Sequence, residues 1–94
     1  MDAGRATEYL AECLWPGVAE ADLVDLDVRT RVSAEAGTDG VRYLGSRLVL
    51  SDEVVFCFFE GPSADAVQAV AERAGIPFER ILESVHLPGR APRD

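Results

Sequence analysis

The chain has 94 residues, of which 48% are hydrophobic and 28% charged, and 17 acidic residues outnumber 9 basic ones. This length and composition predict a single small soluble domain over residues 1–94, with a core of about 6–87 and a flexible tail over 88–94. The net charge of −8 argues against nucleic acid and anionic membrane surfaces as partners, because both attract basic proteins. No apolar run approaches the roughly 20 residues of a membrane span and no signal pattern opens the chain, so a cytoplasmic protein is expected.

The first half of the chain is expected to form a strand and a helix. Residues 7–15 alternate between two faces, as a β-strand does, and Pro16-Gly17 ends the alternation. Residues 19–36 are expected to form an amphipathic helix, whose apolar side carries the valines at positions 24, 28 and 32, joined by Leu23 and Leu26. The acidic residues of this helix come early and its arginines late, which is the order that the helix dipole favours.

A hairpin is expected next. Residues 41–50 and 54–60 predict two strands joined by the three-residue connection Ser51-Asp52-Glu53. In this register Arg47 faces Cys57 and Gly45 faces Phe59. The second strand is apolar at both parities, which predicts that both of its faces are covered.

The remaining elements complete a known topology. Ser63 is expected to cap a second helix with apolar residues at 67, 70, 71 and 74, and Gly75 to end it. A last strand is expected near residues 81–87. The order β-α-β-β-α-β predicts a ferredoxin-like α+β sandwich, with a four-stranded antiparallel sheet in the spatial order 4-1-3-2 and both helices on one face.

The sheet face without helices is expected to be apolar. In the predicted register this open face carries Tyr43, Val55, Cys57 and Phe59. Such a face is poorly suited to water, so two sheets are expected to meet as in a dimeric α/β barrel and to enclose a shared space. A homodimer is therefore predicted.

Three segments of the chain resemble a family of small bacterial ferredoxin-like proteins described as nickel-binding and, before that, as a domain of unknown function. They are Tyr9 to Pro16, the hairpin residues Val41 to Ser46 with Val55 to Ser63, and Ala74 to Ile81. The resemblance covers about residues 7–87. It implies a homodimeric α/β sandwich, with a metal in some members.

One position departs from that family. Its members carry a histidine in an aromatic-aliphatic-His-Ser stretch, which in this sequence is Tyr43-Leu44-Gly45-Ser46. Nickel prefers imidazole ligands, so Gly45 removes the ligand that the resemblance implies. Replacement of a ring by glycine is also expected to open volume beside Phe59, which suits an organic ligand at least as well as a metal.

The candidate ligand-binding residues are Glu12, Tyr43, Gly45, Arg47 and Phe59. Arg47 lies in the middle of the hairpin, on the face expected to be covered. A buried guanidinium needs a carboxylate or an anionic ligand, so Arg47 either pairs with Glu12 or receives the anionic group of a ligand. Tyr43 is either a packing aromatic or a ligand stacker.

His86, the only histidine, and Glu12 are the candidate metal ligands, with nickel as the cofactor that the resemblance implies. His86 is expected on the last strand near its end, as a solvated side chain, a proton shuttle or a ligand. Cys13 and Cys57 lack a CxxC spacing and are expected to be buried, reduced thiols.

The leading functional hypothesis is a homodimeric binding protein that holds a small ligand or a divalent metal near the sheet-to-sheet interface. The alternative is a cofactor-free dimeric α/β barrel enzyme acting on a small aromatic or polyketide-like substrate, with acid-base or orienting groups drawn from His86, Arg47, Glu12 and Tyr43. A third hypothesis is an assembly module whose open face is only a subunit contact. The sequence identifies no catalytic residue.

Overall fold

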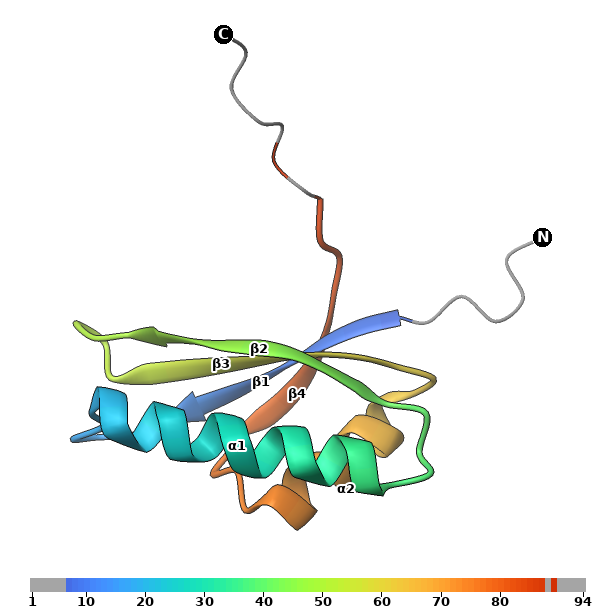
Figure 1. Ribbon diagram of the computed structural model, residues 1–94. Coiled ribbons are helices and arrows are strands. Elements are labelled where there is room, and N and C mark those ends of the chain that lie inside the picture. Colours follow the sequence, from blue (N-terminus) through green and yellow to red (C-terminus); the bar gives the residue numbers. More distant parts are fainter. Residues whose placement is uncertain (1–6, 88, 90–94) are drawn as a thin grey trace, which may run out of the picture.

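The structure is a computed structural model that describes residues 7–87 and residue 89. Its elements are β1 (Thr7–Leu14), α1 (Glu20–Ala36), β2 (Arg42–Val49), β3 (Val54–Gly61), α2 (Ala64–Ala74) and β4 (Arg80–Ser84). The strands form one antiparallel sheet in the order β2-β3-β1-β4, and both helices lie on the same side of it (Figure 1). The predicted ferredoxin-like topology and strand order are therefore confirmed. Within the described residues, no helix is long and apolar enough to cross a membrane.

The core lies between the sheet and the two helices. Odd-numbered residues from 9 to 13 in β1 and from 55 to 61 in β3 are buried on the helix side, and even-numbered residues of both strands face the open side. The largest fully buried side chains include Phe59 from β3, Leu26 from α1, and Val67 and Val70 from α2. The two central strands and the helices thus share one apolar interior.

The hairpin register differs by one residue from the prediction. Val49 pairs with Val54, so Arg47 faces Phe56 rather than Cys57. The connection has four residues instead of three, because two overlapping turns form it: the N–H of Asp52 donates to Val49 O, and the N–H of Glu53 donates to Leu50 O. Glu53 adopts the left-handed backbone conformation with φ 53°, which closes the second turn.

A β-bulge in β2 changes which residues face the helices. Tyr43 pairs with Phe59 and Gly45 pairs with Phe58, so the ladder takes in one extra residue at this point. Gly45 has φ 122°, a conformation that only glycine adopts freely. The predicted open face of Tyr43, Val55, Cys57 and Phe59 is wrong, because the helices cover the odd-numbered side of β3, and Tyr43, which pairs with Phe59, lies on that same side. Gly45 accordingly lies beside Phe58 and not beside Phe59.

Helix α1 has the predicted extent but buries a different side. Its valines at positions 24, 28 and 32 are 64%, 54% and 59% exposed, whereas Leu26 and Thr30 are fully buried. Two polar side chains occupy the core side because their hydroxyls are satisfied there: Thr30 Oγ1 donates to Leu26 O at 2.7 Å, and Ser33 Oγ donates to Val70 O at 2.9 Å. The valine spacing therefore pointed to the wrong side of the helix, whereas the predicted apolar residues Leu26 and Leu23 do contribute to the core.

Helix α2 begins and ends as predicted. Ser63 Oγ accepts a hydrogen bond from Ala66 N at 3.1 Å, which satisfies one of the free N–H groups of the first turn. Gly75 follows the helix in the left-handed conformation, with φ 74°, and its N–H bonds Ala71 O and Glu72 O.

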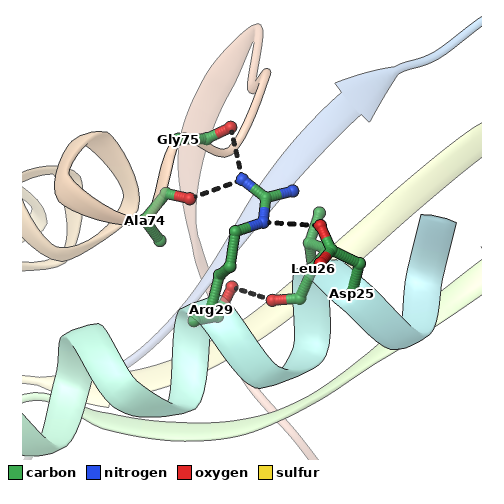
Figure 2. A network of polar contacts seen from close by, with 6 residues as sticks. Asp25, Leu26, Arg29, Ala74 and Gly75 are labelled. Atoms are coloured by element: carbon green, nitrogen blue, oxygen red, sulfur yellow. Dashed lines mark hydrogen bonds and ion pairs between the residues drawn. The ribbon is translucent and has the colours of Figure 1, made fainter.

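Arg29 fastens α1 to the end of α2 (Figure 2). Its Nη1 donates to Ala74 O at 2.7 Å and to Gly75 O at 3.3 Å, and its Nε donates to Asp25 Oδ2 at 2.9 Å. The guanidinium thus satisfies carbonyls that the helix end leaves free, at the pole where a positive charge is favourable.

The last strand is shorter than predicted. β4 ends at Ser84, so His86 lies beyond the strand rather than on it. Val85 and Leu87 are both 83% exposed, because no neighbouring strand or helix covers this segment. The predicted flexible tail over 88–94 falls, except for residue 89, outside the described residues.

A polar network joins α1 to β2. Tyr43 Oη donates to Asp27 Oδ1 at 2.8 Å, and Arg31 Nη2 donates to Asp27 Oδ2 at 3.0 Å. The Tyr43 hydrogen bond, followed by that of Arg31, holds the pKa of Asp27 below its ordinary value, while burial raises the pKa of Tyr43. Asp27 is therefore an acceptor that stabilises the fold in its ionised form.

We expect Asp27→Asn to lower the free energy of unfolding by about 1 kcal/mol at pH 7, because a charge-assisted bond becomes a neutral one. Since folding depresses the pKa of Asp27, its contribution to stability is fully present above the pKa of the unfolded chain. This contribution is lost as the pH falls through the lower pKa of the folded state. Urea denaturation should show the gap between wild type and variant closing below about pH 4.

Asp25→Asn is the matched control for this measurement. Asp25 also pairs with an arginine four residues later, at 2.9 Å, but it bonds no tyrosine. Its change should be smaller than that of Asp27→Asn. An equal loss in both variants would show that the helical ion pairs, and not Tyr43, account for the effect.

Candidate functional site

The open face of the sheet is apolar in its middle and charged toward its ends. One row across the strands contains Leu82, Leu10 and Phe58, and Phe56 and Leu44 lie next to it. These five side chains are only partly buried or are exposed. The predicted apolar open face is therefore present, but it consists of residues other than those expected.

A hollow of about 460 Å³ lies on this face. It is lined by Glu8, Leu44, Arg47, Phe58 and His86. We call it the open-face hollow. Two of the predicted site residues, Arg47 and His86, therefore line the same space, and two apolar side chains and a carboxylate join them.

Arg47 is the free cation of the hollow. It is exposed, and within residues 7–87 it takes part in none of the five ion pairs. On the same strand Arg42 pairs with Glu60 at 3.0 Å. Arg47 thus presents a guanidinium that can bind a carboxylate or another planar anion by donating hydrogen bonds to it.

Glu12 does not pair with Arg47. Both residues lie in one row of the open face, but Phe56 of β3 stands between them, which places their strands roughly 10 Å apart. Instead, Glu12 Oε1 accepts a hydrogen bond from Arg80 Nε on β4 at 2.6 Å. The predicted ion pair between Glu12 and Arg47 is therefore not formed, and the role of Arg47 as a ligand group stays a prediction.

Tyr43 and Phe59 lie on the other side of the sheet. Their ring centroids are 5.6 Å apart, Phe59 is fully buried, and Arg31 Cζ lies 5.5 Å from the Tyr43 ring. Both rings pack beneath α1, so they cannot line the open-face hollow. Gly45 is on the open side, where an added Cβ would contact no other atom within 4 Å.

The described residues do not form a nickel site within one subunit. His86 and Glu8 are the nitrogen and oxygen donors of the hollow, and they share it with the cation Arg47. The sequence has no second histidine, and among the described residues no three His, Cys, Asp or Glu side chains come together. Glu12, the other predicted metal ligand, is held by Arg80 outside the hollow.

The two thiols belong to the core. Cys13 and Cys57 are fully buried on the helix side of β1 and β3, and they are reduced as predicted. The neighbouring Cys57 thiol, followed by burial, raises the pKa of Cys13. A protonated thiol on the far side of the sheet cannot serve the open-face hollow.

Sequence reasoning missed Glu8, Leu44 and Phe58 as site residues. Glu8 shares the parity of Glu12 in the first strand, which was a readable signal. Phe58 required knowing which face of β3 the helices cover, because that strand is apolar on both faces, and Leu44 required the bulge in β2. Both features are set by tertiary contacts, and no local pattern in the sequence marks them.

Comparison with known proteins identifies the family of this chain. A family model described as "Nickel responsive protein SCO4226-like" matches residues 9–83. The crystal structure of SCO4226 from Streptomyces coelicolor A3(2) is similar with a TM-score of 0.68 and 26% identity, over 87% of this chain and 99% of that one. No curated protein matches. Because the family model and the solved structure both match nearly the whole domain, the chain belongs to the SCO4226-like family of nickel-responsive proteins.

Proposed function

We propose that this protein is a homodimeric binding protein that holds a small ligand in the open-face hollow. The ligand has an apolar body and an anionic group, and a second copy of the chain covers it. One observation carries the proposal: the hollow of about 460 Å³ combines the apolar walls Leu44 and Phe58 with the free guanidinium of Arg47.

The apolar open face supports the dimer. Leu10, Phe56, Phe58 and Leu82 lie on adjacent strands, and the helices leave this side of the sheet uncovered (Figure 1). A contiguous apolar patch of this kind favours a protein contact over water. When two such faces meet about a two-fold axis, each hollow is closed by the other sheet.

Ligand chemistry follows from Arg47. A guanidinium enclosed by a second subunit loses water, and a planar anion restores its hydrogen bonds in a bidentate geometry. Phe58 offers the flat apolar surface on which an aromatic ring can pack. An aromatic carboxylate matches both groups.

Nickel is the second candidate, because family membership and the shared lining of His86 and Glu8 favour it. One subunit lacks the donors for this ion, so two copies would have to supply them. The enzyme alternative would use the same hollow, but within the described residues His86 has no hydrogen-bonded acid or thiol that would prepare it for acid-base chemistry.

We expect benzoate to stabilise the protein more than benzamide does, since only the anion meets the charge of Arg47. A ligand at a hundred times its dissociation constant adds about 2.7 kcal/mol, which thermal unfolding over a benzoate titration would reveal. Arg47→Gln should remove the preference for benzoate.

Arg42→Gln is the matched control, because it removes the same charge from the same strand outside the hollow. This variant should keep the preference for benzoate. Equal shifts with benzoate and benzamide, or an equal loss in both variants, would contradict the proposed anion site. If no aromatic acid stabilises the protein, the hypothesis of an assembly module without a ligand is the one that remains.

For nickel, equilibrium dialysis at micromolar metal should give less than one ion per two chains, because one imidazole is a poor donor set. Gly45→His should raise the uptake, since the position has free space for a side chain. It should also cost about 1–3 kcal/mol of stability, because φ is 122° there.

The wild type could instead take up one or more ions per two chains, with the uptake abolished in His86→Ala. That result would make nickel, and not an organic anion, the ligand of the hollow. Unchanged uptake in Gly45→His would show that the missing imidazole is not what limits nickel binding.

A further inference from the structure

Helix α1 presents an apolar stripe to solvent. Val24, Val28 and Val32 recur every fourth residue on the side opposite the core, and each is more than half exposed. β-Branched residues are mediocre helix formers, so a row of them on a solvated surface contributes little to the helix itself. The stripe borders a groove of about 420 Å³ between the helices, lined in part by Ala36 of α1 and Ala74 of α2.

The charges beside the stripe are arranged symmetrically about Val28. Two acids precede it, Asp25 and Asp27, and two arginines follow it, Arg29 and Arg31. At about 100° per residue, Asp25 and Arg29 lie on one side of the stripe, and Asp27 and Arg31 lie on the other. The structure agrees, because the first pair lies toward α2 and the second toward Tyr43 of β2, with ion-pair distances of 2.9 and 3.0 Å.

We propose that the outer face of α1 binds the same face of a second copy, antiparallel, about a two-fold axis at Val28. In this arrangement Val24 of one copy lies on Val32 of the other, and the two Val28 side chains meet at the axis. Each flank then brings an acid of one helix beside an arginine of the other, so that two ion pairs become a network of four charges on either side.

The charge order selects this orientation. In a parallel two-fold contact, the Asp25 side of one helix would meet the Asp27 side of the other. At 1.5 Å rise per residue, each flank would then hold two like-charged neighbours and one unlike pair, each about 3 Å apart in height, which is repulsive on balance. The antiparallel contact reverses this balance, with two unlike pairs and one like-charged pair on each flank, and it covers the valine stripe at the same time.

This contact is independent of the proposed ligand site. Both helices lie on one side of the sheet (Figure 1). The open-face hollow is lined by residues of the other side. A chain that uses both surfaces forms assemblies larger than two chains. A chain that uses only one of them forms two-chain assemblies.

Val28→Glu tests the α1 contact by placing two carboxylates together at the two-fold axis. Light scattering of the full chain should give a mass of at least four chains for the wild type and of two chains for the variant, with 10.2 kDa per chain. Ala64→Glu adds the same charge to the exposed start of α2 and should keep the wild-type mass. Because Val28 is 54% exposed, the variant should fold, and thermal unfolding checks this.

Phe58→Asp separates the two surfaces. Two chains in this variant and one chain in the double variant Val28→Glu with Phe58→Asp would support both contacts. A mass that falls only with Phe58→Asp would overturn the α1 contact and leave the sheet dimer in place. A mass that falls only with Val28→Glu would support the α1 contact and remove the sheet dimer.

Cross-linking tests the orientation. Chains with Val24→Cys and chains with Val32→Cys should form a mixed disulfide on mild oxidation. Each variant alone should form far less disulfide, because like positions lie apart in the antiparallel contact. The native thiols do not compete, since they are buried. Self-linking of the Val24→Cys chains at a yield equal to the mixed product would overturn the antiparallel arrangement.

Discussion

The pairing of β2 with β3 is the constraint on which the site depends. Successive side chains of a strand point to opposite faces, so a shift of one residue exchanges the core and solvent sides. The four-residue turn after Val49 and the bulge at Gly45 together direct Tyr43 and Ser46 to the helices and Arg47 to the open side. Without the bulge, the Tyr43 hydroxyl could not reach Asp27, and α1 would lose a bond that fixes its position on the sheet.

The same pairing explains how this chain differs from what its family description suggests. The second strand offers glycine where the resemblance expects an imidazole, and glycine is also the residue that the bulge geometry favours. The polar groups that remain on the open face are a guanidinium, a carboxylate and one histidine. That set is better suited to an organic anion than to a borderline-soft cation that seeks several imidazole or thiolate ligands.

The candidate site was only partly accessible to sequence reasoning. Arg47 and His86, chosen because a cation in an apolar hairpin and a single histidine are conspicuous by type, both line the hollow, and their contact with a ligand stays a prediction. Glu12, Tyr43 and Phe59 were chosen by the same reasoning and do not line the hollow. Glu12 pairs with Arg80, which lies 68 residues later in the sequence. The rings of Tyr43 and Phe59 lie on the helix side of the sheet.

The sequence by itself determined the order of strands and helices, the ends of α2 and the presence of a second apolar face. Those features depend on local propensity, on the Ser63 and Gly75 caps and on total apolar content, all of which are legible along the chain. Tertiary structure alone decided which side of α1 is buried and which side chains share the hollow. The reason is that hydroxyls such as those of Thr30 and Ser33 can enter a core once a distant or preceding carbonyl satisfies them, and strand register is fixed by pairing across the sheet.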